Sequence, residues 1–246
     1  MDRLIYTAMT GAKHILEQQA TTSNNLANAS TSGFRAQIDS FRAVPVQGDG
    51  LATRAFVVDA TVGADFTPGT VQSTGRPLDV ALQGKGWLVV QMADGSEAYT
   101  RGGGLSTSAN GLLQTGAGLT VQGEGGPIAV PPAATVAIAS DGTVSTIATD
   151  TKPASTTVIG RLKLVNPPEQ SLVRGDDGLF RLRDGSTAEA DPAVTVVAAA
   201  LEGSNVNPVD AMVDMISLAR QFDTQMSLLK NAESNAGKAT EILTLN

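Results

Sequence analysis

The sequence predicts a mainly β central domain with α-helical, coiled-coil-like segments at both ends of the chain, a discontinuous α + β architecture. Three observations predict this fold class. Apolar residues recur at alternating steps of three and four over the first thirty residues and again over 208–243. Residues 76–201 instead hold short β-rich runs separated by Asp-Gly and Asn-Gly pairs. Aromatic residues make up only 4% of the chain, beside 26 Gly and 11 Pro, which suits short strands joined by turns.

The C-terminal apolar stripe follows a set of helix-start signals. Asn205 and Asn207 are candidate caps, Pro208 suits a first turn, and Asp210 and Asp214 lie where the helix dipole favours anions. Burying the large side chains of this stripe would contribute roughly 10 to 15 kcal/mol, whereas without a partner surface such a helix is marginal. The stripe consists of Met212, Met215, Ala219, Phe222, Met226 and Leu229, and it resumes at Ala236 and Leu243.

The N-terminal stripe is weaker, because Gln19 and Thr22 interrupt it and its alanines bury little area. An antiparallel pair of the two helices would therefore leave the C-terminal stripe partly exposed, which predicts that other copies or other proteins complete its burial. The alternative is a terminal hairpin packed on the chain's own globular domain. The expected subunit-interface residues are Ile5, Ala8, Ala12, Ile15, Leu26, Met212, Met215, Ala219, Phe222, Met226, Leu229 and Leu243.

These patterns predict three parts. Residues 1–32 with 205–246 form a terminal helical domain, 33–75 an extended connector with a hairpin around 55–58, and 76–204 an all-β domain of the sandwich or irregular-barrel kind. The strands are expected at 78–82, 87–91, 98–101, 119–122, 136–139, 144–147, 158–165, 179–183 and 194–201, with turns at 94–95, 110–111, 141–142, 177–178 and 184–185.

Composition argues against several kinds of chemistry. A net charge of -7 disfavours a phosphate-binding surface, so no nucleic-acid partner is expected. The chain has no cysteine, which excludes thiol nucleophiles and thiolate metal sites. His14, the single histidine, falls beside the apolar stripe and is expected to be a partly exposed helix residue. Asp176, Asp177 and Asp184 fit turns better than a calcium site. No catalytic, cofactor-binding or metal residue is expected.

Neither membrane insertion nor a cleaved signal is expected. No apolar run approaches the ~20 residues that cross a bilayer. Residues 1–10 lack the basic region and apolar core of a secretory signal peptide. We therefore expect a protein that either stays in the cytoplasm or leaves it by a route that keeps the N-terminus.

Three passages, in the same order along the chain, resemble the signatures of one family, the bacterial flagellar rod and hook proteins. The N-terminal passage is Asn24-Asn25-Leu26-Ala27-Asn28, continuing through Gly33, Phe34 and Arg35. The C-terminal passage is Leu201-Glu202-Gly203-Ser204-Asn205-Val206-Asn207-Pro208-Val209. Between them, 75–87 and 98–101 are similar to the family's central domain. Gly102-Gly103-Gly104 departs from the polar residues usual there.

The resemblance implies a structural subunit of the flagellar basal-body rod in the periplasm. Such subunits pass through the flagellar type III export apparatus without a cleaved signal, and assemble helically with copies of themselves and with other proximal and distal rod proteins. Their terminal helices line the export channel, their β domain faces outward, and they transmit torque for motility.

Residues 2–9 and 15–19 resemble the proximal-rod type more than the longer distal-rod type. In such a subunit, residues 23–35 would form a polar turn in which Asn side chains bond backbone groups. The alternative function is a β-domain hydrolase or carbohydrate-binding protein that dimerises through its helices.

Overall fold

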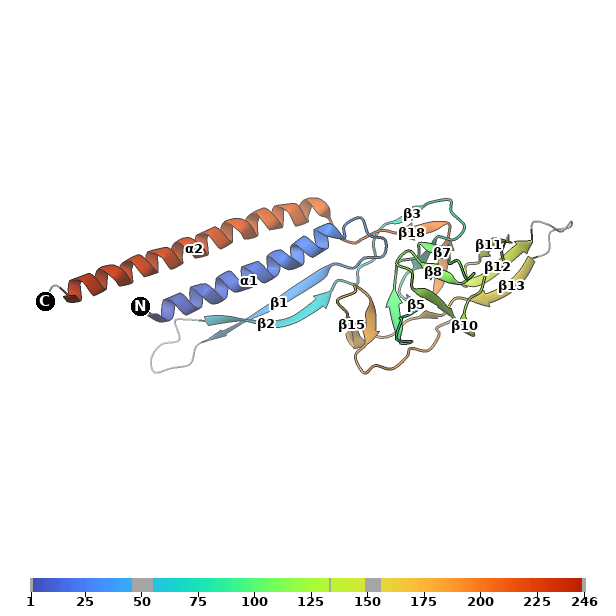
Figure 1. Cartoon of the computed structure of the whole chain (residues 1–246), viewed down its shortest axis with the longest axis horizontal. Coiled ribbons are helices and arrows are strands. Elements are labelled where there is room, and N and C mark those ends of the chain that lie inside the picture. Colours follow the sequence, from blue (N-terminus) through green and yellow to red (C-terminus); the bar gives the residue numbers. More distant parts are fainter. Residues whose placement is uncertain (1, 46–54, 133, 149–155, 245–246) are drawn as a thin grey trace. The chain divides into compact units, whose positions relative to one another are not determined.

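A computed structural model describes residues 2–45, 55–132, 134–148 and 156–244 (Figure 1). The chain divides into two compact units. The helical unit comprises Met1–Ala29, Gln37–Asp65 and Val206–Asn246, and the β unit comprises Ser30–Ala36 and Phe66–Asn205. The predicted connector, 33–75, is thus shared between them, because its strands pair with each other and pack on the N-terminal helix.

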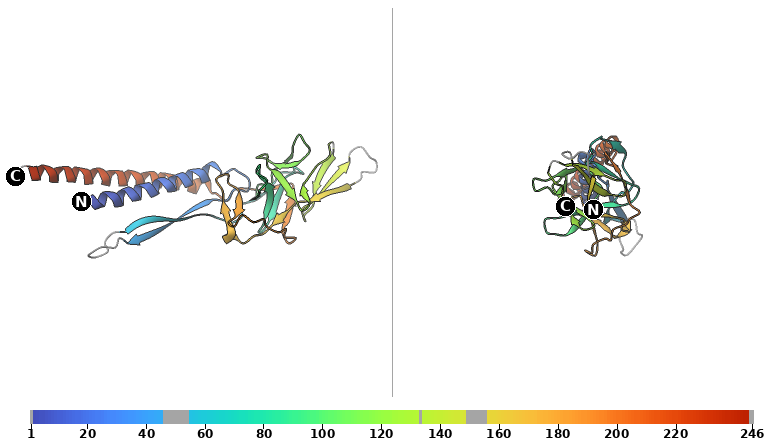
Figure 2. Two further views of the ribbon diagram at one scale, coloured as in Figure 1. Left: turned by 60° about the horizontal axis from the view of Figure 1, so that its bottom comes forward. Right: turned by 90° about the vertical axis from the view of Figure 1, so that its right-hand side faces the viewer.

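The helical unit is built on two antiparallel helices, α1 (Asp2–Ala27) and α2 (Pro208–Thr244). They lie side by side in the views of Figures 1 and 2, and α2 runs on past the N-terminus of α1. The greater length of α2 accounts for this overhang, since it has 37 residues against 26 in α1. Together with the strands described below, the two helices confirm the predicted fold class.

A β-hairpin packs along α1 in the same unit. Strand β1 (Gln37–Pro45) pairs antiparallel with β2 (Ala55–Ala64), and a bulge interrupts the register between Ser40 and Phe41. The hairpin is longer than the sequence suggested, because the apolar residues of its first strand, Ile38, Phe41 and Val44, recur at steps of three and hide the two-residue period of a strand. His14 is buried against β1, with its ring 5.3 Å from that of Phe41, so the expectation of a partly exposed histidine was wrong.

The β unit consists of short antiparallel strands and a 3₁₀ turn, Glu169–Ser171. Its strands are β3 (Val71–Ser73), β4 (Val80–Gln83), β5 (Trp87–Gln91), β6 (Glu97–Thr100), β7 (Leu105–Thr107), β8 (Leu113–Thr115), β9 (Thr120–Gly123), β10 (Gly126–Pro127), β11 (Ala134–Ile138), β12 (Thr143–Ala148), β13 (Thr156–Arg161), β14 (Leu164–Val165), β15 (Leu172–Arg174), β16 (Phe180–Leu182), β17 (Thr195–Ala198) and β18 (Ala200–Glu202).

The largest sheet of the β unit follows the order β15-β16-β6-β5-β9-β8-β7. The order β11-β12-β13 forms a second sheet, while β17 pairs with β4 and β18 with β3. The inward side chains form one core that includes the fully buried Val80, Leu88, Val90, Leu105, Leu113, Val121 and Val144. Trp87 packs on Phe180, with ring centroids 4.6 Å apart, and on Phe66 at 5.9 Å.

Two predicted strands are interrupted. The run 194–201 divides into β17 and β18 at Ala199, whose φ of 56° is not extended backbone. The Ala199 carbonyl there accepts hydrogen bonds from the N–H groups of Thr74 and Gly75. The run 158–165 divides between β13 and β14. The N–H groups of Leu162 and Lys163 donate to the carbonyls of Gly142 and Gln122, which lie outside the β12–β13 ladder.

Candidate assembly site and the meeting of the two terminal motifs

The inner face of α1 carries small apolar residues. Ala8, Ala12 and Ile15 are all buried, and Leu26 is partly buried near the helix end. Gly11 lies against Gln225 of α2, since a Cβ added to it would stand 3.6 Å from the Gln225 amide carbon. Small residues on one helix let the other approach closely. Ile5 and Leu243 fall outside the part of the chain whose side chains the structure describes.

The stripe predicted on α2 is divided between two faces of the helix. Met215, Phe222 and Leu229 are partly buried, whereas Met212, Ala219 and Met226 are exposed. Ala211, Leu218 and Gln225 complete the less exposed row. That row also alternates steps of four and three, so the spacing alone could not decide which row faces α1.

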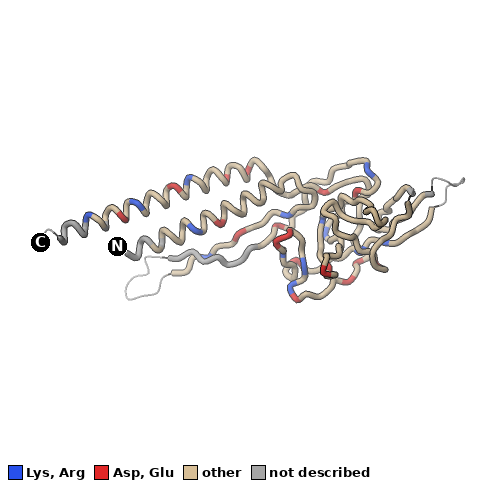
Figure 3. The backbone as a smooth tube through the Cα atoms, viewed as in Figure 1, with Lys and Arg blue, Asp and Glu red and all other residues tan. Residues whose placement is uncertain are grey.

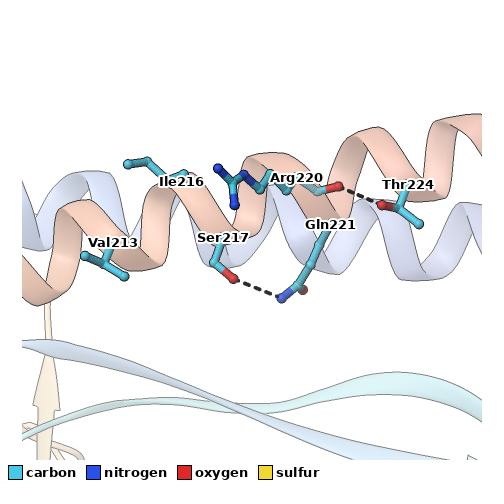
Figure 4. A pocket seen from close by; sticks show the side chains of 6 residues that line it. All are labelled: Val213, Ile216, Ser217, Arg220, Gln221 and Thr224. Atoms are coloured by element: carbon cyan, nitrogen blue, oxygen red, sulfur yellow. Dashed lines mark hydrogen bonds between the residues drawn. The ribbon is translucent and has the colours of Figure 1, made fainter.

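An exposed apolar cluster therefore remains near the start of α2. It consists of Val209, Met212, Val213 and Ile216, which are between 53% and 66% exposed. A shallow pocket of about 320 Å³ adjoins it, lined by Val213, Ile216, Ser217, Arg220, Gln221 and Thr224 (Figure 4). The rest of α2 is more polar, with basic and acidic residues interspersed along it (Figure 3). Neither described helix is long and apolar enough to span a membrane.

The N-terminal motif ends α1 and fixes the start of β1. The Asn25 amide donates to the Gln37 carbonyl at 2.9 Å, and its oxygen accepts the Gln37 N–H at 2.8 Å. Asn28 donates to the carbonyl of Asn24 at 2.9 Å, in the last turn of the helix. Ala27 is the last helical residue. The expected bonding of Asn side chains to backbone groups is confirmed. The turn predicted at 23–35 begins later than expected, because the residues up to Ala27 are helical.

The C-terminal motif starts α2 with a side-chain cap. Asn207 Oδ1 accepts the Val209 N–H at 3.0 Å, while Pro208 occupies the first helical position. The Asn207 amide also donates to Asp210 at 2.7 Å. Asn205, the other candidate cap, instead accepts the Ala36 N–H at 2.7 Å and donates to the Thr67 carbonyl at 3.1 Å. Ser204 and Val206 are partly buried in the same link.

Replacing Asn207 with alanine is expected to destabilise the start of α2 by about 1 kcal/mol, because the Val209 N–H loses its acceptor. Amide hydrogen exchange of the first turn of α2 measures this loss. Asn231→Ala, at an exposed position inside the helix, is the matched control and should slow exchange or leave it unchanged. Equal protection in both variants would contradict the assignment of the cap.

The two motifs meet in the β unit around a buried carboxylate. Glu202, on β18, lies 2.6 Å from Arg35 Nη2 through one oxygen and 2.6 Å from Arg101 Nε through the other. The Gly69 N–H adds a third hydrogen bond, at 3.0 Å. All three charged side chains are 4% exposed or less. The Gly33 N–H donates to the Glu202 carbonyl at 2.8 Å, which joins the backbones of the two motifs.

The two arginines are satisfied unequally. Arg101 also donates to the carbonyls of Gly86 and Leu82, at 2.8 and 3.1 Å. Burial lowers the pKa of its guanidinium, and the Glu202 charge opposes that shift. Nε and Nη1 of Arg35 are buried without a hydrogen-bond partner in the structure. Because Glu202 is the carboxylate that both arginines bind, its loss would leave two positive charges buried together.

Arg174 closes the other side of this cluster. Its guanidinium lies 4.4 Å from the centre of the Phe34 ring and donates to the Arg35 carbonyl at 2.8 Å. Burial lowers the pKa of Arg174. Phe34 is buried as a result, so the aromatic residue of the N-terminal motif is a packing residue of the β unit.

Asp176, Asp177 and Asp184 lie in turns, as the sequence predicted in preference to a calcium site. Asp177 accepts the Leu179 N–H at 3.1 Å and pairs with Arg181, whose hydrogen bond lowers the pKa of that carboxyl. Asp184 accepts the Ser186 N–H at 3.1 Å, and the Ser186 hydroxyl lowers its pKa. Among the described residues, no group of three or more His, Asp or Glu side chains is placed to hold a metal ion.

Comparison with known proteins matches the chain to flagellar families at three places. Residues 5–35 match the flagella basal body rod protein family, residues 81–146 the flagellar hook protein FlgE/F/G D1 domain, and residues 197–242 the flagellar basal body rod FlgEFG protein C-terminal family. The first and last matches contain the two motifs that meet at Glu202.

Whole-chain relatives carry the same names. The flagellar basal-body rod protein FlgF of Salmonella typhimurium is 50% identical over 252 residues, and that of Escherichia coli K12 is 51% identical over 253, each covering 100% of both chains. The rod protein FlgG of Bacillus subtilis is 29% identical over 256 residues, covering 95% of this chain and 96% of its own.

The chain therefore belongs to the flagellar basal-body rod protein family, as a structural subunit of the bacterial flagellar rod. Within that family its similarity over the full length is to FlgF, and FlgG is a more distant relative.

Proposed function

We propose that this rod subunit is of the proximal-rod type, and that it assembles through its α1–α2 pair with other rod subunits and with copies of itself. In this role it transmits torque and surrounds the export channel, and it catalyses no reaction. In the assembled rod the two terminal helices line the channel. The flagellar export apparatus is its partner before assembly. We propose no nucleic-acid partner and no insertion into the membrane.

The apolar cluster of α2 is the observation that carries this proposal. Val209, Met212, Val213 and Ile216 remain more than half exposed although α1 already covers the opposite row of the helix. Covering the four side chains would contribute roughly 4 to 7 kcal/mol per subunit, about three fifths of the value for complete transfer from water. That contribution is large enough to favour association where each subunit has several neighbours.

The predicted interface residues take different parts in this arrangement. Ala8, Ala12 and Ile15 of α1 are buried, and Phe222 and Leu229 of α2 are partly buried, so these residues serve the packing of the helical unit. Met212, Ala219 and Met226 are exposed and available to neighbouring subunits. Within one subunit, α1 and α2 thus pack against each other, and a neighbouring subunit covers the apolar cluster of α2.

Replacing Ile216 with aspartate is expected to abolish incorporation into the rod, because docking would bury an unpaired carboxylate. The free subunit should keep its melting temperature, since Ile216 is 56% exposed. Swimming of a complemented deletion strain and binding of the purified chain to other rod subunits measure the effect.

Ser227→Asp is the matched control. It adds the same charge to the same side of α2, about three helical turns further on, at an exposed polar position. We expect normal swimming and binding for this variant. If Ile216→Asp also swims and binds normally, α2 does not assemble through this cluster and the proposal is wrong.

A further inference from the structure

The sulfur atoms of this chain are concentrated on its helices. The chain has no cysteine and six methionines. Met9 on α1 and Met212 on α2 are 55% and 53% exposed, and Met226 is 37% exposed. Met215 is partly buried in the helical unit, and Met92 packs against the core of the β unit. Among the methionines that the structure describes, the most exposed therefore lie on the helix pair.

Met212 also lies within the apolar cluster of α2, between Val209 and Val213 and one turn before Ile216. We propose that Met212 is a site of reversible oxidation to methionine sulfoxide that blocks docking of the cluster. This inference rests on the proposed function, which makes the cluster a docking surface. It adds a covalent modification that regulates docking, which assembly alone does not require.

Hydrogen peroxide is a sufficient oxidant for this step. The thioether sulfur attacks one peroxide oxygen, so that an S–O bond forms as the O–O bond breaks. The displaced hydroxide takes the proton from the oxygen that is now bonded to sulfur, and it leaves as water. The sulfur loses two electrons and the peroxide gains them. A thiol-dependent methionine sulfoxide reductase reverses the change, with two thiols supplying the electrons as they form a disulfide and the oxygen leaving as water.

The product changes the docking surface in a defined way. A flexible apolar side chain becomes a polar one that gains a strong hydrogen-bond acceptor, the sulfoxide oxygen. A neighbour that buries the cluster would have to strip water from this oxygen without offering a donor in an apolar surface. We expect association to weaken roughly ten-fold when Met212 is oxidised.

The test treats the purified full-length chain with hydrogen peroxide and maps sulfoxides by peptide mass spectrometry. Met212 is expected to oxidise well before Met92, which is partly buried in the β unit. Binding to the other purified rod subunits is then compared before and after treatment, and again after incubation with the reductase. We expect binding to fall about ten-fold and to return after reduction.

Three variants assign the effect to one residue. Met212→Leu preserves volume and cannot be oxidised, so its binding should be normal and resistant to peroxide. Met212→Gln places a polar group there permanently, so its binding should be weak without peroxide. Met9→Leu is the matched control on α1 and should stay as sensitive as the natural chain. Peroxide sensitivity that persists in Met212→Leu would overturn the inference.

The variant Ile216→Asp separates this inference from the function on which it rests. If Ile216→Asp loses binding while oxidised chain and Met212→Gln bind normally, the docking surface stands and the oxidation switch is wrong. If Ile216→Asp binds normally, the docking surface itself is wrong and the switch falls with it.

Discussion

Replacing Glu202 with glutamine is expected to lower the free energy of unfolding of the β unit by about 3 to 5 kcal/mol. The substitution keeps the shape of the side chain but removes its charge and turns one acceptor oxygen into an N–H donor. That donor would face the guanidinium of Arg35 or Arg101, each 2.6 Å from a carboxylate oxygen in the structure. Two buried cations would then lack their shared anion.

Denaturant unfolding followed by tryptophan fluorescence measures this change. Trp87 is the single tryptophan of the chain and is buried in the β unit. Glu169→Gln is the matched control, because Glu169 pairs with Lys85 at 2.9 Å with both side chains exposed. Exposed pairs contribute little, so this variant should lie within about 1 kcal/mol of the natural chain.

A triple variant tests whether the loss arises from uncompensated charge. Arg35→Met, Arg101→Met and Glu202→Leu together remove the three charged groups and leave apolar side chains of similar size. We expect this variant to be more stable than Glu202→Gln, since burying ions costs nearly as much as their pairing returns. The loss that remains comes from the Gly69 N–H and the Gly86 and Leu82 carbonyls, which lose their partners. A loss as large as that of Glu202→Gln would mean that the hydrogen-bond geometry, and not the charge balance, determines stability.

The sequence predicts this cluster only in part. The motifs containing Arg35 and Glu202 can be recognised as family signatures, and Arg101 is the last residue of a predicted strand. Their pairing cannot be predicted, because Glu202 lies 167 positions from Arg35 and 101 from Arg101. Propensity and periodicity describe neighbours along the chain, whereas a buried ion pair depends on which strands meet. The available sequence signal for the buried cluster was Arg35, a charged residue in an N-terminal motif otherwise rich in small residues.

For the helices, too, the sequence predicts the element better than its packing. Spacing and the cap at Asn207 predict α2 well, since both depend on adjacent residues. The inward row differs from the predicted one at Ala211, Leu218 and Gln225, and Gly11 of α1 leaves room for the Gln225 side chain. Met212 and Met226, which the predicted stripe places in the interface of the two helices, are therefore exposed, whereas Met215 is partly buried.

Replacing Gly33 with alanine is expected to destabilise the β unit by about 2 to 5 kcal/mol, for two reasons that add. Gly33 has a φ of 70°, a left-handed conformation that costs other residues about 1 to 2 kcal/mol. A Cβ at this position would also overlap the backbone carbonyl carbon of Arg101 and the nitrogen of Gly102. Relief of that overlap would move Arg101 away from Glu202, or pull the Gly33 N–H from the Glu202 carbonyl.

Gly75→Ala separates the two reasons. Gly75 has nearly the same φ, 71°, but a Cβ there would meet nothing within 4 Å. This control therefore carries the conformational cost alone, about 1 to 2 kcal/mol. The difference between the two variants, read from the same Trp87 unfolding transition, measures how tightly the N-terminal motif is packed on Arg101. If the two variants are equally stable, the crowding is relaxed at no cost, and Gly33 serves only the turn. If Gly33→Ala is less stable by 2 kcal/mol or more, the small residue of the motif is required by the same buried cluster that needs Glu202.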